Sequence, residues 1–199
     1  MPWEPPDDSA YAYLLGWYLG DGYLGDTGRT YQLVITADLA YLQIVLECRA
    51  AIIATVPGRV PQLRPHPVHN WVRVECGWSR WPEVFPQHGP GRKHDRPIVL
   101  EPWQERIVEA HPWRFLAGLL HSDGCRTINR FKTNLPSGRV AEYEYPRWFF
   151  SNMSADIRGL FCGTCEQLGV RWTQSNHRNI SISHRHSVAL LDEHVGPKA

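Results

Sequence analysis

The sequence has almost no excess of charge of either sign. Its 199 residues include 21 Lys and Arg against 20 Asp and Glu, so the formal net charge is only +1. A strong basic field that would attract a polyanion is lacking, which weakens the case for a nucleic-acid partner without excluding it. Only three of the basic residues are lysines. Arginine carries most of the positive charge, and its planar guanidinium is the better group for bidentate contacts with phosphate and guanine.

Long apolar runs and a secretory leader are also missing. The most apolar stretch, 39–56, is interrupted by Gln43, Glu47 and Arg49, which favours an amphipathic core helix over a membrane span. The first residues have neither a basic n-region nor an apolar h-region. We therefore expect a cytoplasmic protein, associated with the nucleoid if the host is bacterial. The five cysteines are an odd number, and in the cytoplasm we expect free thiols.

What the sequence does contain is a nine-residue pattern that occurs twice, roughly one hundred residues apart. Residues 14–22, LLGWYLGDG, are echoed by residues 116–124, LAGLLHSDG. Each copy is an apolar helical run with small residues four apart, and each ends in Asp-Gly. A single Asp-Gly is a common turn. Its recurrence at the end of the same pattern indicates a pseudo-symmetric protein that brings two carboxylates together.

The elements expected around the two copies follow one order. The first half is expected to hold helices at 10–20, 39–55 and 78–85, and strands at 23–24, 31–36, 59–64 and 71–76. Residues 87–97 form a natural linker, and a connecting helix at about 101–110 leads to the second half. There we expect helices at 112–122, 155–168 and 187–195, and strands at 125–133, 142–152, 170–176 and 179–184. The sequence thus predicts an α+β protein of two αββαββα halves, 1–98 and 99–199, packed through their motif helices.

Each copy of the pattern places an aspartate, Asp21 or Asp123, at the C-terminal end of a helix. The unpaired carbonyls there already carry partial negative charge, so a carboxylate is poorly placed unless a cation is present. Packing through the small residues would let the two backbones approach and set the acids side by side. Two carboxylates with nearby carbonyls and water suit Mg²⁺ better than zinc. Such a site fits metal-assisted cleavage of phosphodiesters.

The two segments resemble the motif that names the LAGLIDADG homing endonucleases, and the chain is similar to the single-chain form with two motifs. The resemblance covers nearly all of the chain, because the order of the elements also matches. It implies a monomer whose antiparallel sheets form a saddle for a long specific site in double-stranded DNA. It also implies cleavage that depends on Mg²⁺, with Mn²⁺ as a substitute. The Met1 start and the lack of splicing-like ends favour an intron-encoded or freestanding gene over an intein.

The resemblance assigns a metal site to the end of each motif. Asp21 and Asp123 occupy the acidic position that binds the metal in the family. The residues before them, Gly20 and Ser122, would contribute backbone carbonyls as further ligands.

The resemblance also concerns positions next to the metal site. Members carry a basic residue after the last helix of each half, near the scissile phosphates, and Lys93 and Lys198 match it, with His94 as a weaker candidate. The sixth motif position, often Asp in the family, is Leu19 in one copy and His121 in the other. That position is not a metal ligand, so the departure does not remove the site.

Alternate side chains of the saddle strands enter the major groove in the family. The basic residues expected to face DNA here are Arg29, Arg59, Arg64, Arg73, Arg126, Arg130, Lys132, Arg147, Arg171 and Arg178.

Other interpretations stay open. Two amphipathic helices could merely pack and end in turns. Some bacterial transcription regulators carry a LAGLIDADG-like domain that binds DNA without cutting it, usually with degenerate acids, whereas both acids are intact here. The low net charge favours this sequence-specific, non-cleaving alternative, since weak general attraction is unusual in a nuclease that searches for one site. A third alternative is a metal-binding or protein-interaction module.

Overall fold

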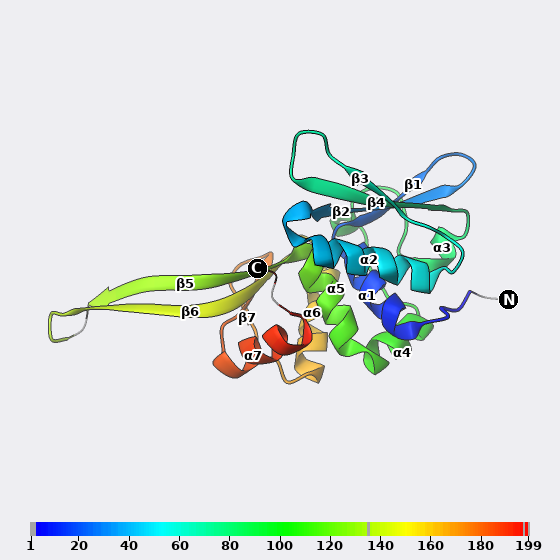
Figure 1. The fold of residues 1–199 in the computed structure, drawn as a ribbon. Helices are drawn as coiled ribbons and strands as arrows, with labels where there is room; N and C mark the ends of the chain where they lie inside the picture. Colours follow the sequence, from blue (N-terminus) through cyan, green and yellow to red (C-terminus); the bar gives the residue numbers. More distant parts are fainter. Residues whose placement is uncertain (1–2, 135, 197, 199) are drawn as a thin grey trace.

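The computed structural model describes residues 3–134, 136–196 and 198, and they form two halves with the same order of elements (Figure 1). The first half consists of α1 (Asp8–Leu19), β1 (Gly22–Asp26), β2 (Tyr31–Asp38), η1 (Leu39–Tyr41), α2 (Leu42–Thr55), β3 (Gln62–Pro65), β4 (Trp71–Trp78), α3 (Trp81–Val84) and η2 (Lys93–Asp95). Helix α4 (Pro102–Ala110) connects it to α5 (Pro112–Asp123), β5 (Gly124–Asn134), β6 (Val140–Ser151), α6 (Ala155–Gln167), β7 (Thr173–Gln174), β8 (Asn179–Ile182) and α7 (Arg185–His194). The predicted α+β class and the αββαββα order are confirmed.

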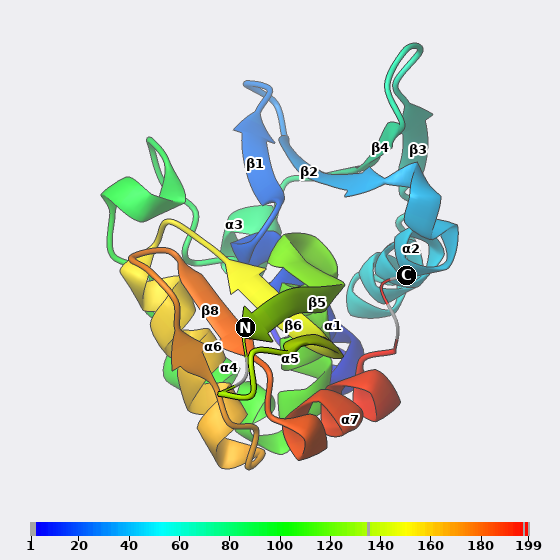
Figure 2. The same cartoon turned by 90° about the vertical axis from the view of Figure 1, so that its left-hand side faces the viewer.

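Each half has a four-stranded antiparallel sheet with the same topology. The strand orders are β1-β2-β4-β3 and β5-β6-β8-β7. In each sheet the first strand begins at the glycine that ends a motif: Gly22 pairs with Ile35, and Gly124 with Phe150. The first sheet is strongly curved, and its outer strands β1 and β3 project away from the helices (Figure 2). One face of each sheet is covered by helices; we call the other the open face.

The motif helices α1 and α5 lie at the centre of the molecule. The side chain of Asp7 caps α1 by accepting a hydrogen bond from the Ala10 amide at 2.9 Å, and Gly20 follows its last turn. Every residue of α1 from Ala10 to Leu19 is buried. Because α1 is apolar on all sides, it is a core helix and not an amphipathic surface helix.

Three expected elements are shorter in the structure, and the predictions for their ends were wrong. The strand expected at 59–64 begins only at Gln62, the first residue of β3. Gly58 adopts φ +86° and the Arg59 amide donates a hydrogen bond to the Val56 carbonyl, so the chain turns before the strand begins. The strand expected at 170–176 is reduced to β7, since Val170 is held by a helix-end bond to Cys165. The helix expected at 78–85 is only α3, because β4 continues to Trp78.

His121, in the sixth position of the second motif, joins three parts of the core. Its Nδ1 lies 2.7 Å from the Tyr13 hydroxyl of α1, and its Nε2 lies 3.1 Å from the carbonyl oxygen of Val195. Burial lowers the pKa of His121 to about 4, so the ring is neutral at pH 7. Because a carbonyl only accepts, Nε2 donates to Val195 and Nδ1 accepts from Tyr13. This departure from the family pattern therefore ties α1, α5 and the C-terminal segment together.

All five cysteines are free thiols, as expected. Among the described residues, no helix is both long and apolar enough to cross a membrane.

Candidate active site at the junction of the halves

Glycine lets α1 and α5 approach at backbone distance. A Cβ on Gly16 would lie 2.6 Å from the carbonyl oxygen of Phe115, and one on Gly118 would overlap the carbonyl oxygen of Tyr13. Real Cβ atoms do not come this close to a backbone, so neither position accepts a side chain unless the helices move apart. The contact through small residues that the repeat predicts is therefore confirmed.

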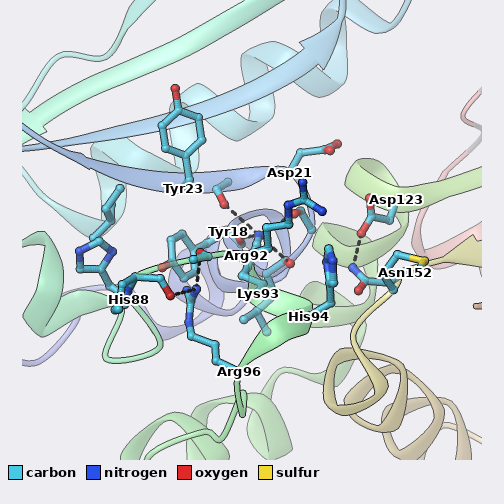
Figure 3. Close-up of a pocket in the computed structure, with 18 of the residues that line it drawn as sticks. Tyr18, Asp21, Tyr23, His88, Arg92, Lys93, His94, Arg96, Asp123 and Asn152 are labelled. Atoms are coloured by element: carbon cyan, nitrogen blue, oxygen red, sulfur yellow. Dashed lines mark hydrogen bonds between the residues drawn. The ribbon is translucent and has the colours of Figure 1, made fainter.

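This contact brings the two acids to one place (Figure 3). Asp21 follows α1 and Gly20, and Asp123 is the last residue of α5. One carboxylate oxygen of Asp123 lies 3.2 Å from where a Cβ on Gly20 would be. Both acids line an open cavity of about 1060 Å³, whose wall also contains Lys93 and His94. Carboxylates from both halves thus share one cavity.

Both carboxylates lie where ionisation is unfavourable. The pKa of Asp123 is raised to about 6, chiefly by burial and then by repulsion from Asp21. Burial also raises the pKa of Asp21, although Lys198 and Lys93 attract its charge. A cation bound between the two acids would relieve both effects.

The raised pKa predicts that Asp123 lowers the stability of the metal-free protein. Its pKa of about 6 lies above the ordinary value of 3.8, so the folded state binds the proton more tightly than the unfolded state. The free-energy cost of holding Asp123 ionised in the folded protein is absent below about pH 4, where the acid is protonated in both states, and it is complete above pH 6. We expect Asp123→Asn to raise the free energy of unfolding at pH 7 by about 2 kcal/mol, a gain that disappears as the pH falls to 4.

This prediction is checked by urea unfolding in chelator at several pH values. Asp95→Asn removes the same charge from an exposed position and should change stability little at any pH. An Asp123→Asn protein that is less stable than wild type at pH 7 would contradict the environment described for this acid.

Each half supplies a lysine that closes its own motif helix. Lys93 Nζ donates hydrogen bonds of 2.6–2.8 Å to the carbonyl oxygens of residues 18, 19, 20 and 22. Lys198 Nζ makes bonds of 2.8–3.4 Å to the equivalent carbonyls of residues 120, 121, 122 and 124. The ammonium groups therefore offset the negative ends of α1 and α5. Burial lowers the pKa of Lys93 to about 8, and it also lowers that of Lys198.

The donors at this site fit a hard divalent cation. The protein offers two carboxylates together with the backbone carbonyls of Gly20 and Ser122, which also accept hydrogen bonds from the lysines. Among the described residues, no group of three or more His, Cys, Asp and Glu side chains could hold a metal ion. An ion held here by only two carboxylates would keep positions for water and phosphate, which is the usual habit of Mg²⁺ and not of zinc.

Asn152 is a site residue that the sequence analysis missed. Its side-chain amide donates to Asp123 at 2.6 Å, and its Oδ1 accepts from the Ser154 amide at 2.8 Å, so the group is fixed from both sides. The strand registers place Ala37 at the equivalent position of the first half. The two acids are therefore not equivalent, because Asp123 has a side-chain partner that the described residues of the first half do not provide for Asp21. Nothing in the sequence marks an asparagine at a strand end as a partner of this acid.

In the first half, two of the predicted DNA-contacting arginines lie on the open face. Val72 and Val74 of β4 are buried in the core, so Arg73 between them points to the open face. Arg64 of β3 is paired with Arg73 in register and lies on the same face. Arg29 and Arg59 lie instead in exposed connections.

In the second half, the predicted residues divide between the two faces of the sheet. Arg147 lies on the open face, where it donates to Ser181 Oγ at 2.7 Å. Trp148 and Phe150 mark the helix-covered face, because both are fully buried. The strand register puts three predicted residues on that same face, and each is paired with an acid: Arg126 with Asp192, Arg130 with Glu144, and Lys132 with Glu142.

The remaining two predicted residues of this half lie outside the strands. Arg171 is exposed before β7, and Arg178 is exposed between β7 and β8.

The chain has two pseudo-symmetric halves, its motif helices pack through glycine, and an acid lies at the end of each helix. These features define a single-chain protein with the two-motif LAGLIDADG fold. The structure of I-DmoI in complex with DNA and Mn has a TM-score of 0.60 and 17% identity, and the match covers 96% of this chain and 99% of that one. I-AabMI, a LAGLIDADG meganuclease bound to uncleaved DNA, has a TM-score of 0.57 and 10% identity, with 92% and 83% coverage. Full-length WhiA from Thermotoga maritima has a TM-score of 0.62 and 14% identity, but its match covers 58% of that chain.

No protein-family model matches the sequence, and no curated protein matches it. At these identities the likeness establishes the fold. The LAGLIDADG resemblance is thereby confirmed at the level of architecture, and activity must be argued from the site itself.

Proposed function

We propose that this protein is a site-specific DNA endonuclease that hydrolyses phosphodiester bonds in both strands of a duplex, with Mg²⁺ or Mn²⁺ as cofactor. One observation carries the proposal: Asp21 and Asp123, from different halves, share a cavity at the ends of two helices packed through glycine. The structure of I-DmoI with DNA and Mn supports the choice of substrate and of a divalent metal. The chain would act as a monomer, with 1–98 and 99–199 each binding one side of the target.

In this proposal each group at the site has a distinct task. Asp21 and Asp123 hold the metal, with the carbonyls of Gly20 and Ser122 close by. When bound, the metal supplies Lewis acidity toward phosphate and a lower pKa for the attacking water. Asn152 positions the Asp123 carboxylate by its hydrogen bond.

Lys93 and Lys198 add positive charge to the site. Their ammonium groups hold the ends of the motif helices and offset the charge that the phosphates bring. His94, which lines the same cavity, would act beside Lys93.

The duplex would lie across the open faces of the two sheets. Arg64, Arg73 and Arg147 already point there and are the first candidates for contacts with base edges and phosphates. Arg29, Arg59, Arg171 and Arg178 lie in exposed connections and would contact the backbone at the edges of the saddle.

A DNA-binding protein without cleavage activity is the second candidate. The net charge of +1 favours it, since general attraction to DNA is weak at this charge. The two intact acids in one open cavity favour cleavage, because a protein that only binds DNA gains nothing from two carboxylates facing a phosphate backbone.

The test is selection of a bound duplex from a random pool, followed by incubation of the winner with Mg²⁺. The proposal expects binding that weakens steeply with salt, and cleavage at one position of the selected site. Binding without cleavage in either Mg²⁺ or Mn²⁺ would favour the second candidate. Failure to bind any duplex would remove both.

A further inference from the structure

Strands β5 and β6 form a hairpin that extends far beyond the rest of the molecule (Figure 1). They are 11 and 12 residues long, against 5 and 8 for the equivalent strands β1 and β2. The third strand, β8, pairs with β6 only at residues 148–151. In the described part of the chain, the outer part of the hairpin therefore has no neighbouring strand, although Arg185 and Val188 of α7 lie near residues 144–146. Its open face is available to a partner.

The two faces of this outer hairpin differ in chemistry. The face that continues the helix-covered side carries the ion pairs Arg130–Glu144 and Lys132–Glu142, in which each charge is matched within the hairpin. On the open face, the strand residues between Arg147 and the hairpin tip carry no charge.

At the centre of that uncharged surface lies an aromatic cluster. Phe131 and Tyr143 are directly opposite one another with ring centroids 5.3 Å apart, and Tyr145 packs edge-on to Phe131 at 5.5 Å. Each of the three remains about 40% exposed. An exposed aromatic cluster on an uncharged strand face is the mark of a contact surface.

We propose that this aromatic cluster, Phe131, Tyr143 and Tyr145, is a reading surface for thymine methyl groups in the major groove. The inference rests on the proposed function and names part of its target sequence. Cations dominate binding to the phosphate backbone, and the strand residues of this surface include none, so its aromatic rings are better suited to base edges. Among the base-pair edges in the major groove, the C5 methyl of thymine is the apolar feature, and apolar side chains are its natural partners.

The position of the cluster along DNA follows from the strand. Gly124 follows Asp123 directly, so β5 starts at the acid pair, and Phe131 lies eight residues beyond Asp123. At a rise of about 3.4 Å per residue, the cluster lies about 27 Å from the acids. Base pairs repeat every 3.4 Å along B-DNA. The thymines read by this cluster should therefore lie about seven to eight base pairs from the centre of the target, where the acid pair lies, on the side bound by the second half.

The open face of the first half differs, because its aromatic side chains lie among charged ones: Tyr23 of β1 is half exposed, and the ring of Trp71 in β4 lies against the guanidinium of Arg73. The same face carries Arg64, Arg73 and Glu75, which suit hydrogen bonds with guanine and cytosine edges. The target is thus expected to be asymmetric, with the contacts of the cluster Phe131, Tyr143 and Tyr145 on one side only.

The experiment measures binding of the selected duplex in chelator, so that cleavage plays no part. Each thymine seven to eight base pairs from the centre is replaced by deoxyuridine, which removes the methyl and keeps the base pair. Wild type should lose affinity about threefold to fivefold for each methyl contacted. Phe131→Ser combined with Tyr143→Ser should bind the thymine and deoxyuridine duplexes equally. Ile128→Ser changes an exposed apolar side chain on the opposite face and should discriminate like wild type.

Three results would overturn the inference in different ways. A selected site without thymines at this distance, or wild-type binding indifferent to deoxyuridine, removes the methyl contact and leaves the proposed function standing. A protein that dimerises with increasing concentration, loses this in the Phe131→Ser and Tyr143→Ser variant, and ignores deoxyuridine would show that the cluster contacts a second copy. Failure to bind any duplex would overturn the proposed function together with this inference.

Discussion

Replacing Gly118 with alanine should destabilise the protein by about 3 kcal/mol or more, enough to unfold much of it under ordinary conditions. The new Cβ would overlap the carbonyl oxygen of Tyr13 and lie 3.0 Å from the Cα of Gly16. No rotamer change can relieve this contact, because backbone meets backbone. The helices must separate, and the separation opens the core around both motifs. Urea unfolding followed by tryptophan fluorescence measures the loss.

Gly163 provides a matched control. It also lies inside a helix, α6, but a Cβ there would meet nothing within 4 Å. Gly163→Ala should therefore stabilise the protein by about 0.5–1 kcal/mol, the ordinary gain in helix propensity. If Gly118→Ala were as stable as Gly163→Ala, the close packing of α1 and α5 would be refuted.

Replacing either acid of the pair with asparagine should abolish measurable cleavage while leaving DNA binding intact. The carboxamide keeps the shape of the side chain but loses the charge that holds a divalent cation. The loss of about 4 kcal/mol or more of transition-state stabilisation corresponds to at least a thousandfold in rate. Single-turnover cleavage of the selected duplex by Asp21→Asn and by Asp123→Asn checks this.

Binding measured in chelator separates the loss of chemistry from the loss of affinity. Removing a carboxylate near the phosphates should leave the affinity unchanged or increase it, because a repulsion disappears. Glu193→Gln, at an exposed acid of α7 that does not line the cavity, changes the net charge equally and should cleave like wild type. Variants of both acids that still cut the duplex would show that the metal lies elsewhere.

The central features of the site were predictable because they depend on local sequence. Apolar periodicity and small residues four apart specify two helices that can touch, and the Asp-Gly ending places an acid at each helix end. Lys93 and Lys198 were expected near the acids only through the resemblance to the LAGLIDADG family, whose members carry a basic residue after the last helix of each half. Their bonds to four carbonyls each could not be predicted, because they depend on how the chain returns to the motif helices.

The facing of the strands could not be predicted for a different reason. In β5, charged and uncharged side chains alternate, but the outer hairpin has no core on either side to show which set points inward. The burial of Trp148 and Phe150 in the partner strand shows which face is covered by helices. Through the strand register, it places Arg126, Arg130 and Lys132 on that face. Asn152 escaped notice because its contact with Asp123 joins residues 29 positions apart.

The most direct test of a shared metal-dependent centre is strand-resolved cleavage of the selected duplex by the wild-type protein. Both strands are labelled, and the reaction is followed in Mg²⁺ and in chelator at concentrations where the duplex is fully bound. We predict that both strands are cut at fixed positions in Mg²⁺ and that neither is cut in chelator. A fully bound duplex that stays intact in Mg²⁺ and Mn²⁺, or one that is cut equally in chelator, would contradict the role of Asp21 and Asp123 as a metal-dependent cleavage centre.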